Sequence, residues 1–183
     1  MRKIPAKPRS SPGTITVRAA PGSRTRALVS FAGRTERAAI ERGGTTARKR
    51  EGDGATPIAE MPLIGGYVRA DRIAPPATRL PLKRTRPGML WCDAPDHACY
   101  NRPATAPFAG RHERMMRDDG LYDVCLVMDW NLRVRRRNSG SAIFFHLMRA
   151  GYQPTEGCIA VSLPAMRRIL AFARKGTRVT VLG

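Results

Sequence analysis

The sequence predicts a mostly β, mixed α+β domain, and three observations support this class. Apolar and polar residues alternate on both sides of Pro21-Gly22-Ser23, which is the pattern of a β-hairpin. Segments 121–130 and 142–148 have the length and the β-branched or aromatic content of buried strands. Only segment 163–175 shows apolar residues at helical spacing over several turns.

The first half of the chain is predicted to hold a tail, a hairpin and loops. Residues 1–13 contain Pro5, Pro8 and Pro12 with basic and no acidic side chains, which predicts a disordered basic tail. The domain then occupies 14–183, starting with strands near 14–19 and 26–31. Segment 35–42 fits either a third strand or a short helix. Prolines recur from 57 to 107, so short strands connected by long loops are expected there.

The last third has the most regular pattern. After the strands at 121–130 and 142–148, a further strand is expected to begin near Gly157. Ser162 is placed to cap a helix over 163–175, with Pro164 in its first turn and Gly176 as its stop. One face of this helix is apolar and comprises Leu163, Met166, Ile169, Leu170 and Ala173. Segment 177–182 closes the domain as a last strand.

The charge of the chain restricts its partners. Lys and Arg number 33 against 14 Asp and Glu, a net charge of +19. Such a surface attracts an anionic polymer, whether nucleic acid, anionic lipid or a carboxylate-rich cell wall. Aromatic residues are only 6%, and no helix-turn-helix or RNA-binding pattern occurs, so nucleic acid is not expected. No stretch approaches the roughly 20 apolar residues of a membrane span, and residues 1–13 have no apolar signal-peptide core.

The cysteines and histidines are few. Four cysteines do not make a disulfide scaffold, and the lack of paired CxxC motifs excludes a zinc ribbon. Cys92 and Cys99 allow a local disulfide, or the start of a metal site with His97 that lacks a fourth ligand nearby. We therefore predict no metal site. Cys125 lies within an apolar strand and is interpreted as a small buried hydrophobe.

His146 and Cys158 are the pair of residues that could carry out catalysis. His146 is late in one predicted strand, and the chain returns to the sheet at Cys158, so the two side chains can meet. A free thiol is mostly protonated at neutral pH, and a neighbouring imidazole can accept its proton. Gly157 lets a substrate approach the backbone, whose amides can stabilise an oxyanion. The alternative is that both side chains are core residues.

The segment SAIFFHLMRAGYQPTEGC, followed by an apolar turn, a helix and GTRVTVL, resembles the L,D-transpeptidase (YkuD-like) catalytic domain. The upstream segments KREGDGATPIAEMPL, WCDAPDHACYNRP and RDDGLYDVCLVMDWN resemble the compact bacterial branch of that family, so the resemblance covers about 14–183. It implies an L,D-transpeptidase-like β-sandwich with one C-terminal helix packed on the sheet. It further implies a monomeric, cofactor-free cysteine transpeptidase that acts on peptidoglycan stem peptides in the periplasm or cell envelope, without membrane insertion.

The resemblance assigns roles to four residues, and Arg149 is added as a candidate in place of an arginine that many members of the family have. Cys158 is expected to be the nucleophile and His146 the proton acceptor, while the backbone of Gly157 and Cys158 holds the oxyanion. Thr155 and Arg149 are expected to bind the substrate.

The sequence departs from the family pattern at three points. Leu147 stands where a glycine usually follows the histidine, Ala160 stands where many members have an arginine, and the loop between His146 and Cys158 is short. Arg149 is the candidate to replace that arginine. Two alternatives stay open: a carboxypeptidase or amidase, in which water resolves the thioester, and a non-catalytic basic protein that binds cell wall or nucleic acid.

Overall fold

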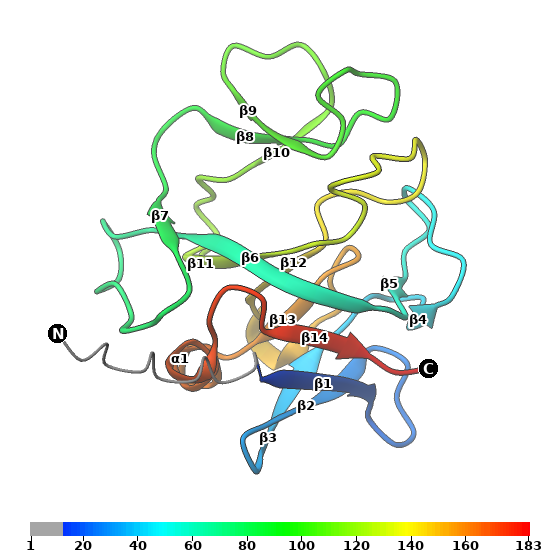
Figure 1. Cartoon of the computed structure of the whole chain (residues 1–183), viewed down its shortest axis with the longest axis vertical. Coiled ribbons are helices and arrows are strands. Elements are labelled where there is room, and N and C mark those ends of the chain that lie inside the picture. Colours follow the sequence, from blue (N-terminus) through cyan, green and yellow to red (C-terminus); the bar gives the residue numbers. More distant parts are fainter. Residues whose placement is uncertain (1–12) are drawn as a thin grey trace, which may run out of the picture.

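The computed structural model describes residues 13–183 as strands with one α-helix (Figure 1). The predicted disordered tail lies outside the described residues except for Gly13, whose carbonyl accepts a hydrogen bond from the Arg178 amide at 3.1 Å. Within 13–183, no helix has the length and apolar character needed to cross a membrane.

The main sheet is closed, so the predicted sandwich is corrected to a barrel-like sheet. Its strand order is β11-β12-β13-β3-β2-β1-β14-β6, and β6 pairs with β11 to complete the ring, while β7 adds to β6. The strands are β1 Thr14–Ala19, β2 Arg26–Phe31, β3 Arg34–Ala39, β6 Glu60–Val68, β7 Leu82–Arg84, β11 Val124–Met128, β12 Phe144–Leu147, β13 Ile159–Val161 and β14 Arg178–Val181.

Strand β6 closes the sheet because it is long and bends. Its residues 60–62 pair with β14, and residues 63–68 pair with β11. Val127 pairs with Gly65 and Met128 with Leu63, so Ile64 is the extra residue of a bulge, which bends a strand and increases its twist. At Gly66 a Cβ atom would lie 2.7 Å from the Cys125 carbonyl oxygen, so only glycine permits this approach.

The local predictions were largely confirmed. β1 and β2 form the antiparallel hairpin, and the ambiguous segment after it is strand β3. Helix α1 spans Leu163–Phe172, and the Ser162 hydroxyl accepts a hydrogen bond from the Ala165 amide at 3.3 Å. The predicted helix end at 175 is wrong, because Ala173 already adopts an extended conformation and the chain turns toward β14.

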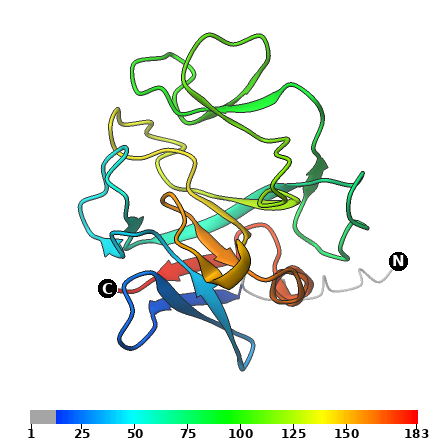
Figure 2. The same cartoon turned by 180° about the vertical axis from the view of Figure 1, so that it is seen from behind.

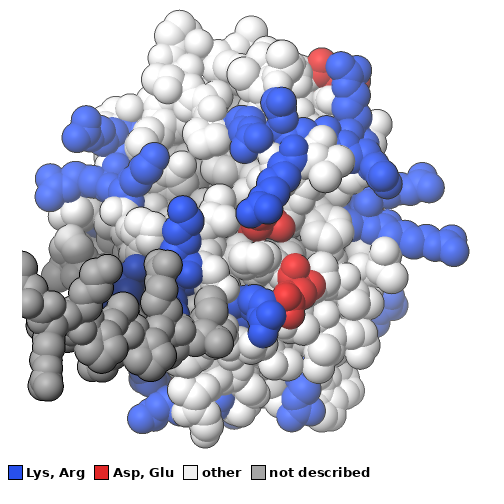
Figure 3. Space-filling view, viewed as in Figure 1, with Lys and Arg blue, Asp and Glu red and all other residues white. Residues whose placement is uncertain are grey.

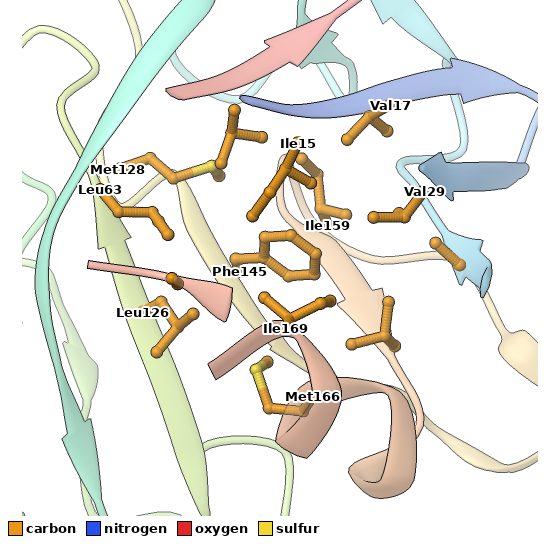
Figure 4. Close-up of a cluster of buried hydrophobic side chains, with 14 of the residues drawn as sticks. Ile15, Val17, Val29, Leu63, Leu126, Met128, Phe145, Ile159, Met166 and Ile169 are labelled. Atoms are coloured by element: carbon orange, nitrogen blue, oxygen red, sulfur yellow. The ribbon is translucent and has the colours of Figure 1, made fainter. Parts of the chain in front are cut away.

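The interior of the barrel is the main hydrophobic core. Residues from several strands, including Ile15, Leu126 and Phe145, pack there with Met166 and Ile169 of α1 (Figure 4). Helix α1 therefore contributes its apolar stripe to the barrel core, as its spacing predicted.

A second apolar cluster lies on the outer face of β11 and β12. Because successive strand residues point to opposite faces, Phe145 enters the barrel core while Phe144 joins the outer cluster. A small sheet of β8 Met89–Cys92, β9 Arg102–Thr105 and β10 His112–Arg114 covers this cluster, at the top of Figure 1 and again in Figure 2. Trp91 packs edge-on against Phe144 with ring centroids 5.1 Å apart.

Two short strands complete the fold near β13. β4 Thr45–Thr46 and β5 Thr56–Pro57 pair in parallel, and a turn of 3-10 helix at Ala150–Tyr152 lies between β12 and β13. The Thr56 hydroxyl donates to the Cys158 carbonyl at 3.4 Å, so the 47–55 loop is anchored beside β13.

Candidate active site

The pairing of β12 with β13 brings His146 and Cys158 to the same face. The two strands are parallel, with His146 beside Ala160, which places Cys158 beside Phe144. Neighbouring residues in a sheet point to the same side, so His146 and Cys158 occupy diagonal positions on the outer face of the barrel. Both line one cavity of about 750 Å³.

The Cys158 thiol is held by backbone groups. Its Sγ donates to the Ala142 carbonyl at 3.3 Å and accepts from the Phe144 amide at 3.4 Å. The pKa of this thiol is raised to about 12, mainly by burial and also by the nearby Glu113 and Glu41 carboxylates, although the hydrogen bond from the Phe144 amide opposes this rise. The thiol is therefore protonated at neutral pH.

His146 is held as a neutral base. Its Nδ1 lies 2.7 Å from the Leu147 carbonyl oxygen, which can only accept, so Nδ1 carries the proton and Nε2 keeps its lone pair. The pKa of His146 is lowered to about 4, mainly by burial and also by the positive charges of Arg117 and Arg149, although the hydrogen bond to the Leu147 carbonyl opposes this. The Tyr122 ring packs against the imidazole, with centroids 5.3 Å apart.

A second thiol flanks His146 but does not open to the cavity. Cys125 is paired with His146 across β11 and β12 and is fully buried, as predicted for a small hydrophobe. Among the residues that the structure describes, Cys158 is the only cysteine lining the cavity. The geometry therefore selects Cys158 over Cys125 as the thiol that a ligand can reach.

The turn before Cys158 depends on Gly157. Its φ of +94° is disfavoured for other residues, and a Cβ would lie 3.3 Å from Cδ1 of Ile143. The Thr155 hydroxyl is buried and donates to the Cys158 carbonyl at 2.7 Å, so it holds the turn. Within 13–183, the Gly157 and Cys158 amides donate to no acceptor, which leaves two donors beside the thiol.

Arg149 reaches the cavity from the loop after β12. Three of the five cavity-lining cations are ion-paired: Lys49 to Asp53, Arg111 to Asp93 and Glu51, and Arg117 to Asp119 and Glu113. Arg149 and Arg42 are exposed and have no ion pair or side-chain hydrogen bond among the described residues. Ala160 lies across from His146, so no arginine projects from that position.

The chain matches the family model of the L,D-transpeptidase catalytic domain (YkuD) over residues 17–181. The chain belongs to this family. No curated protein and no solved structure gives a significant match. Members of the L,D-transpeptidase family act on peptidoglycan peptides and are associated with the cell wall.

Sequence reasoning missed several residues of this candidate site. Glu41, Thr56, Glu113 and Tyr122 reach the cavity or the Cys158 turn from strands and loops distant in the chain. None of these four residues belongs to a sequence motif that indicates catalysis. Only the tertiary contacts reveal them.

The other cysteines and histidines of the L,D-transpeptidase domain lie on or near the small sheet. Cys92 and Cys99 are free thiols, so the local disulfide that the sequence allowed is absent from the structure. Within 13–183, no three His, Cys, Asp or Glu side chains gather as a metal site would require.

The buried His146 is expected to make this L,D-transpeptidase domain less stable in weak acid. Its folded pKa of about 4 lies below its usual 6.5, so between these values the unfolded chain binds a proton that the native state does not. The stability that the neutral His146 contributes to the fold is therefore fully present above pH 6.5 and decreases as the pH falls toward 4. Between pH 6.5 and pH 5 the loss in the free energy of unfolding is about 2 kcal/mol.

Urea denaturation at the two pH values measures this loss. His146→Gln, which cannot titrate there, should lose about 2 kcal/mol less than the wild type over the same interval. Equal losses in both proteins would show that His146 is not buried as a neutral group.

Proposed function

We propose that this protein is a peptidoglycan L,D-transpeptidase with Cys158 as nucleophile and His146 as proton acceptor. The observation that carries the proposal is the shared cavity. A thiol and a neutral imidazole with a free Nε2 lie on one face of β12–β13, beside two backbone amides without acceptors. This combination is what thiol-dependent acyl transfer requires.

The first half-reaction forms a thioester. Sγ attacks the carbonyl carbon that joins the stem-peptide diamino acid to the following D-residue, while the thiol proton passes to Nε2. Because the resting thiol has a pKa of about 12 and the imidazole about 4, transfer must accompany bond formation. The amides of Gly157 and Cys158 hold the oxyanion. The C–N bond then breaks, His146 protonates the leaving amine and a D-amino acid departs.

The second half-reaction forms the crosslink. The amine of an acceptor stem attacks the thioester carbonyl and gives its proton to His146. The C–S bond breaks, Cys158 recovers its proton and a new amide joins the two stems. No ATP is consumed, because the energy of the first amide is kept in the thioester.

The proposal is tested with a purified stem tetrapeptide. Intact mass spectrometry should show an adduct that lacks the terminal D-residue, and peptide mapping should place it on Cys158. With excess tetrapeptide as acceptor, a crosslinked dimer should accumulate. A product shortened by one residue without dimer would favour the carboxypeptidase alternative. No adduct, together with tight salt-sensitive duplex binding, would favour the nucleic-acid alternative.

In this proposal Arg149 binds a substrate carboxylate, because it lines the cavity without an ion pair and no arginine occupies position 160. Arg149→Gln should raise KM for the donor about 10-fold and leave kcat nearly unchanged, since a lost charged hydrogen bond is worth about 1.5 kcal/mol.

Steady-state kinetics with a carboxylate donor and its amide measure this effect. The amide should react equally with wild type and variant. Arg133→Gln, which changes an exposed arginine outside the cavity, is the matched control. An unchanged KM in Arg149→Gln would assign carboxylate binding elsewhere.

A further inference from the structure

The loop between β11 and β12 carries a concentrated positive charge. Lys and Arg outnumber Asp and Glu by 33 to 14 in the whole chain, and the face in Figure 3 shows many basic and few acidic side chains. Residues 131–138 contain four arginines and no acidic residue. All four are exposed: Arg133, Arg135, Arg136 and Arg137. A run of one sign attracts an anion, but it makes a defined site only if its backbone is fixed.

The backbone of the 131–138 loop is fixed by hydrogen bonds. The Asn131 side chain accepts from the Arg136 amide at 2.8 Å and donates to the Arg136 carbonyl at 2.9 Å. The Asn138 carbonyl accepts from the Glu51 amide at 3.0 Å, which joins this loop to the 47–55 loop (yellow and cyan in Figure 1). Arg135 has a φ of +49°, which is unfavourable for an arginine and free for a glycine. The loop therefore displays its arginines from a defined and locally strained backbone.

A small cleft of about 200 Å³ lies between the 131–138 loop and the loop that follows β8. Its cationic residues are Arg135 and Arg137, and its apolar residues are Pro95, Ala98 and Val134. The Arg135 guanidinium donates to the Ala98 carbonyl at 3.0 Å, which connects the two loops. Among the described residues, none that lines this cleft is acidic. The cleft is therefore a built and positively charged space.

The polar groups of the cleft keep hydrogen-bond donors for a ligand. Arg135 uses one of its five N–H groups on a backbone carbonyl. Arg137 lies 3.8 Å from an oxygen of Asp96, but the two side chains are 69% and 93% exposed, so this ion pair is weak. His97 also lines the cleft, and its Nδ1 accepts from the Cys99 amide at 3.0 Å. In the neutral ring Nε2 therefore carries the proton and can donate.

These groups fit the free carboxyl end of a peptide. Guanidinium groups bind the two oxygens of a planar carboxylate with matching geometry. Val134 is 79% exposed and offers an apolar contact beside the two arginines, as a small side chain next to that carboxylate requires. Pockets for whole drug-sized ligands measure about 300 to 1,000 Å³, so this cleft accommodates a smaller group such as a terminal residue.

The cleft is separate from the cavity of Cys158 and lies next to it. The loop after β8 borders both spaces, because Asp93 lines the cavity whereas Tyr100 lines the cleft. The Tyr100 hydroxyl donates to Glu51, which lines the cavity from the other side of this wall. A polymer that carries many stem peptides can therefore occupy both spaces at once.

We propose that the cleft is a second binding site, in which Arg135 and Arg137 hold the free carboxylate of one stem peptide while another stem of the same polymer reacts at Cys158. The identity of this ligand rests on the proposed function. Two attachments to one polymer raise the effective concentration of stems at the thiol without any contact with the reacting atoms.

The test measures cosedimentation of the full chain with purified peptidoglycan sacculi, with Cys158→Ala present throughout to prevent turnover. Arg135→Gly combined with Arg137→Gln should bind about 10- to 100-fold more weakly, because hydrogen bonds from charged groups are lost. Glycine at 135 accepts the positive φ, so the loop keeps its shape. The control, Arg18→Gln with Arg34→Gln, removes the same charge from exposed positions of β1 and β3 that line neither space, and should bind like the parent.

Two further measurements identify the ligand and the site. Sacculi whose free carboxylates have been converted to amides should bind the parent as weakly as native sacculi bind the cleft variant. With Cys158 restored, the cleft variant should form the thioester with a soluble tetrapeptide at the wild-type rate, because the cleft does not hold the reacting stem.

Equal binding of native sacculi by the cleft variant and its control would overturn the inference, as would full binding of the parent to amidated sacculi. A cleft variant that loses affinity for a DNA duplex and keeps its affinity for sacculi would assign the cleft to nucleic-acid phosphates instead. The absence of a thioester with the soluble tetrapeptide would overturn the proposed function, whereas the sacculus comparison would still decide on the cleft.

Discussion

Replacing Cys158 with alanine is expected to abolish the thioester and to reduce turnover by at least about 10³-fold, because the reaction loses its nucleophile. Within 13–183 no other cysteine lines the cavity, so no neighbouring thiol can substitute. Cys158→Ser should be nearly as inactive, because a serine hydroxyl is a much weaker acid than a thiol. The measurement is intact mass after incubation with the tetrapeptide, together with product chromatography.

The matched control for Cys158 is Cys99→Ala, which removes a partly exposed cysteine outside the cavity. It should form the adduct at the wild-type rate. Because burial keeps Cys158 protonated, Cys99 should also react first with a small electrophile such as iodoacetamide when no substrate is present. A persistent adduct in Cys158→Ala would move the nucleophile to another side chain.

Replacing His146 with alanine is expected to slow acylation by about 10² to 10⁴-fold, the usual contribution of a general base. The Nδ1 bond to the Leu147 carbonyl directs the lone pair of Nε2 away from that carbonyl, and the low pKa of the imidazole keeps it neutral. The wild-type acylation rate should therefore change little between pH 5 and pH 8 and fall as pH approaches 4.

The pH profile of His146→Ala separates catalysis from packing. Without a base, the reaction depends on a preformed thiolate with a pKa of about 12, so its rate should rise about tenfold per pH unit up to pH 8. His112→Ala is the control, because that side chain does not line the cavity. A folded His146→Ala with the wild-type rate and a flat profile would make His146 a structural residue.

Local rules account for the elements that were predicted correctly. The hairpin follows from alternation around Pro21-Gly22-Ser23, and the start of α1 follows from the Ser162 cap. The helix end was misplaced because Ala173, a good helix former, is drawn into an extended conformation by the connection to β14. Closure of the sheet was missed because it depends on β6 pairing with β11, residues far apart in the chain.

The sequence alone determined the family, the strand-rich class and the pair of His146 with Cys158. These depend on short-range patterns, namely strand alternation and the Thr-x-Gly-Cys turn, in which Gly157 adopts a positive φ and the Thr155 hydroxyl bonds to the Cys158 carbonyl. Such contacts span only a few residues, so the residue types reveal them.

Only the tertiary structure decided the protonation states and the charge of the cavity. A pKa of about 12 for Cys158 and about 4 for His146 results mainly from burial under the small sheet, and burial is a property of the packed chain. Glu41 likewise has no distinguishing neighbours in the sequence. It lines the cavity because β3 lies beside β13, which brings residue 41 next to Thr155 and the turn that ends at Cys158.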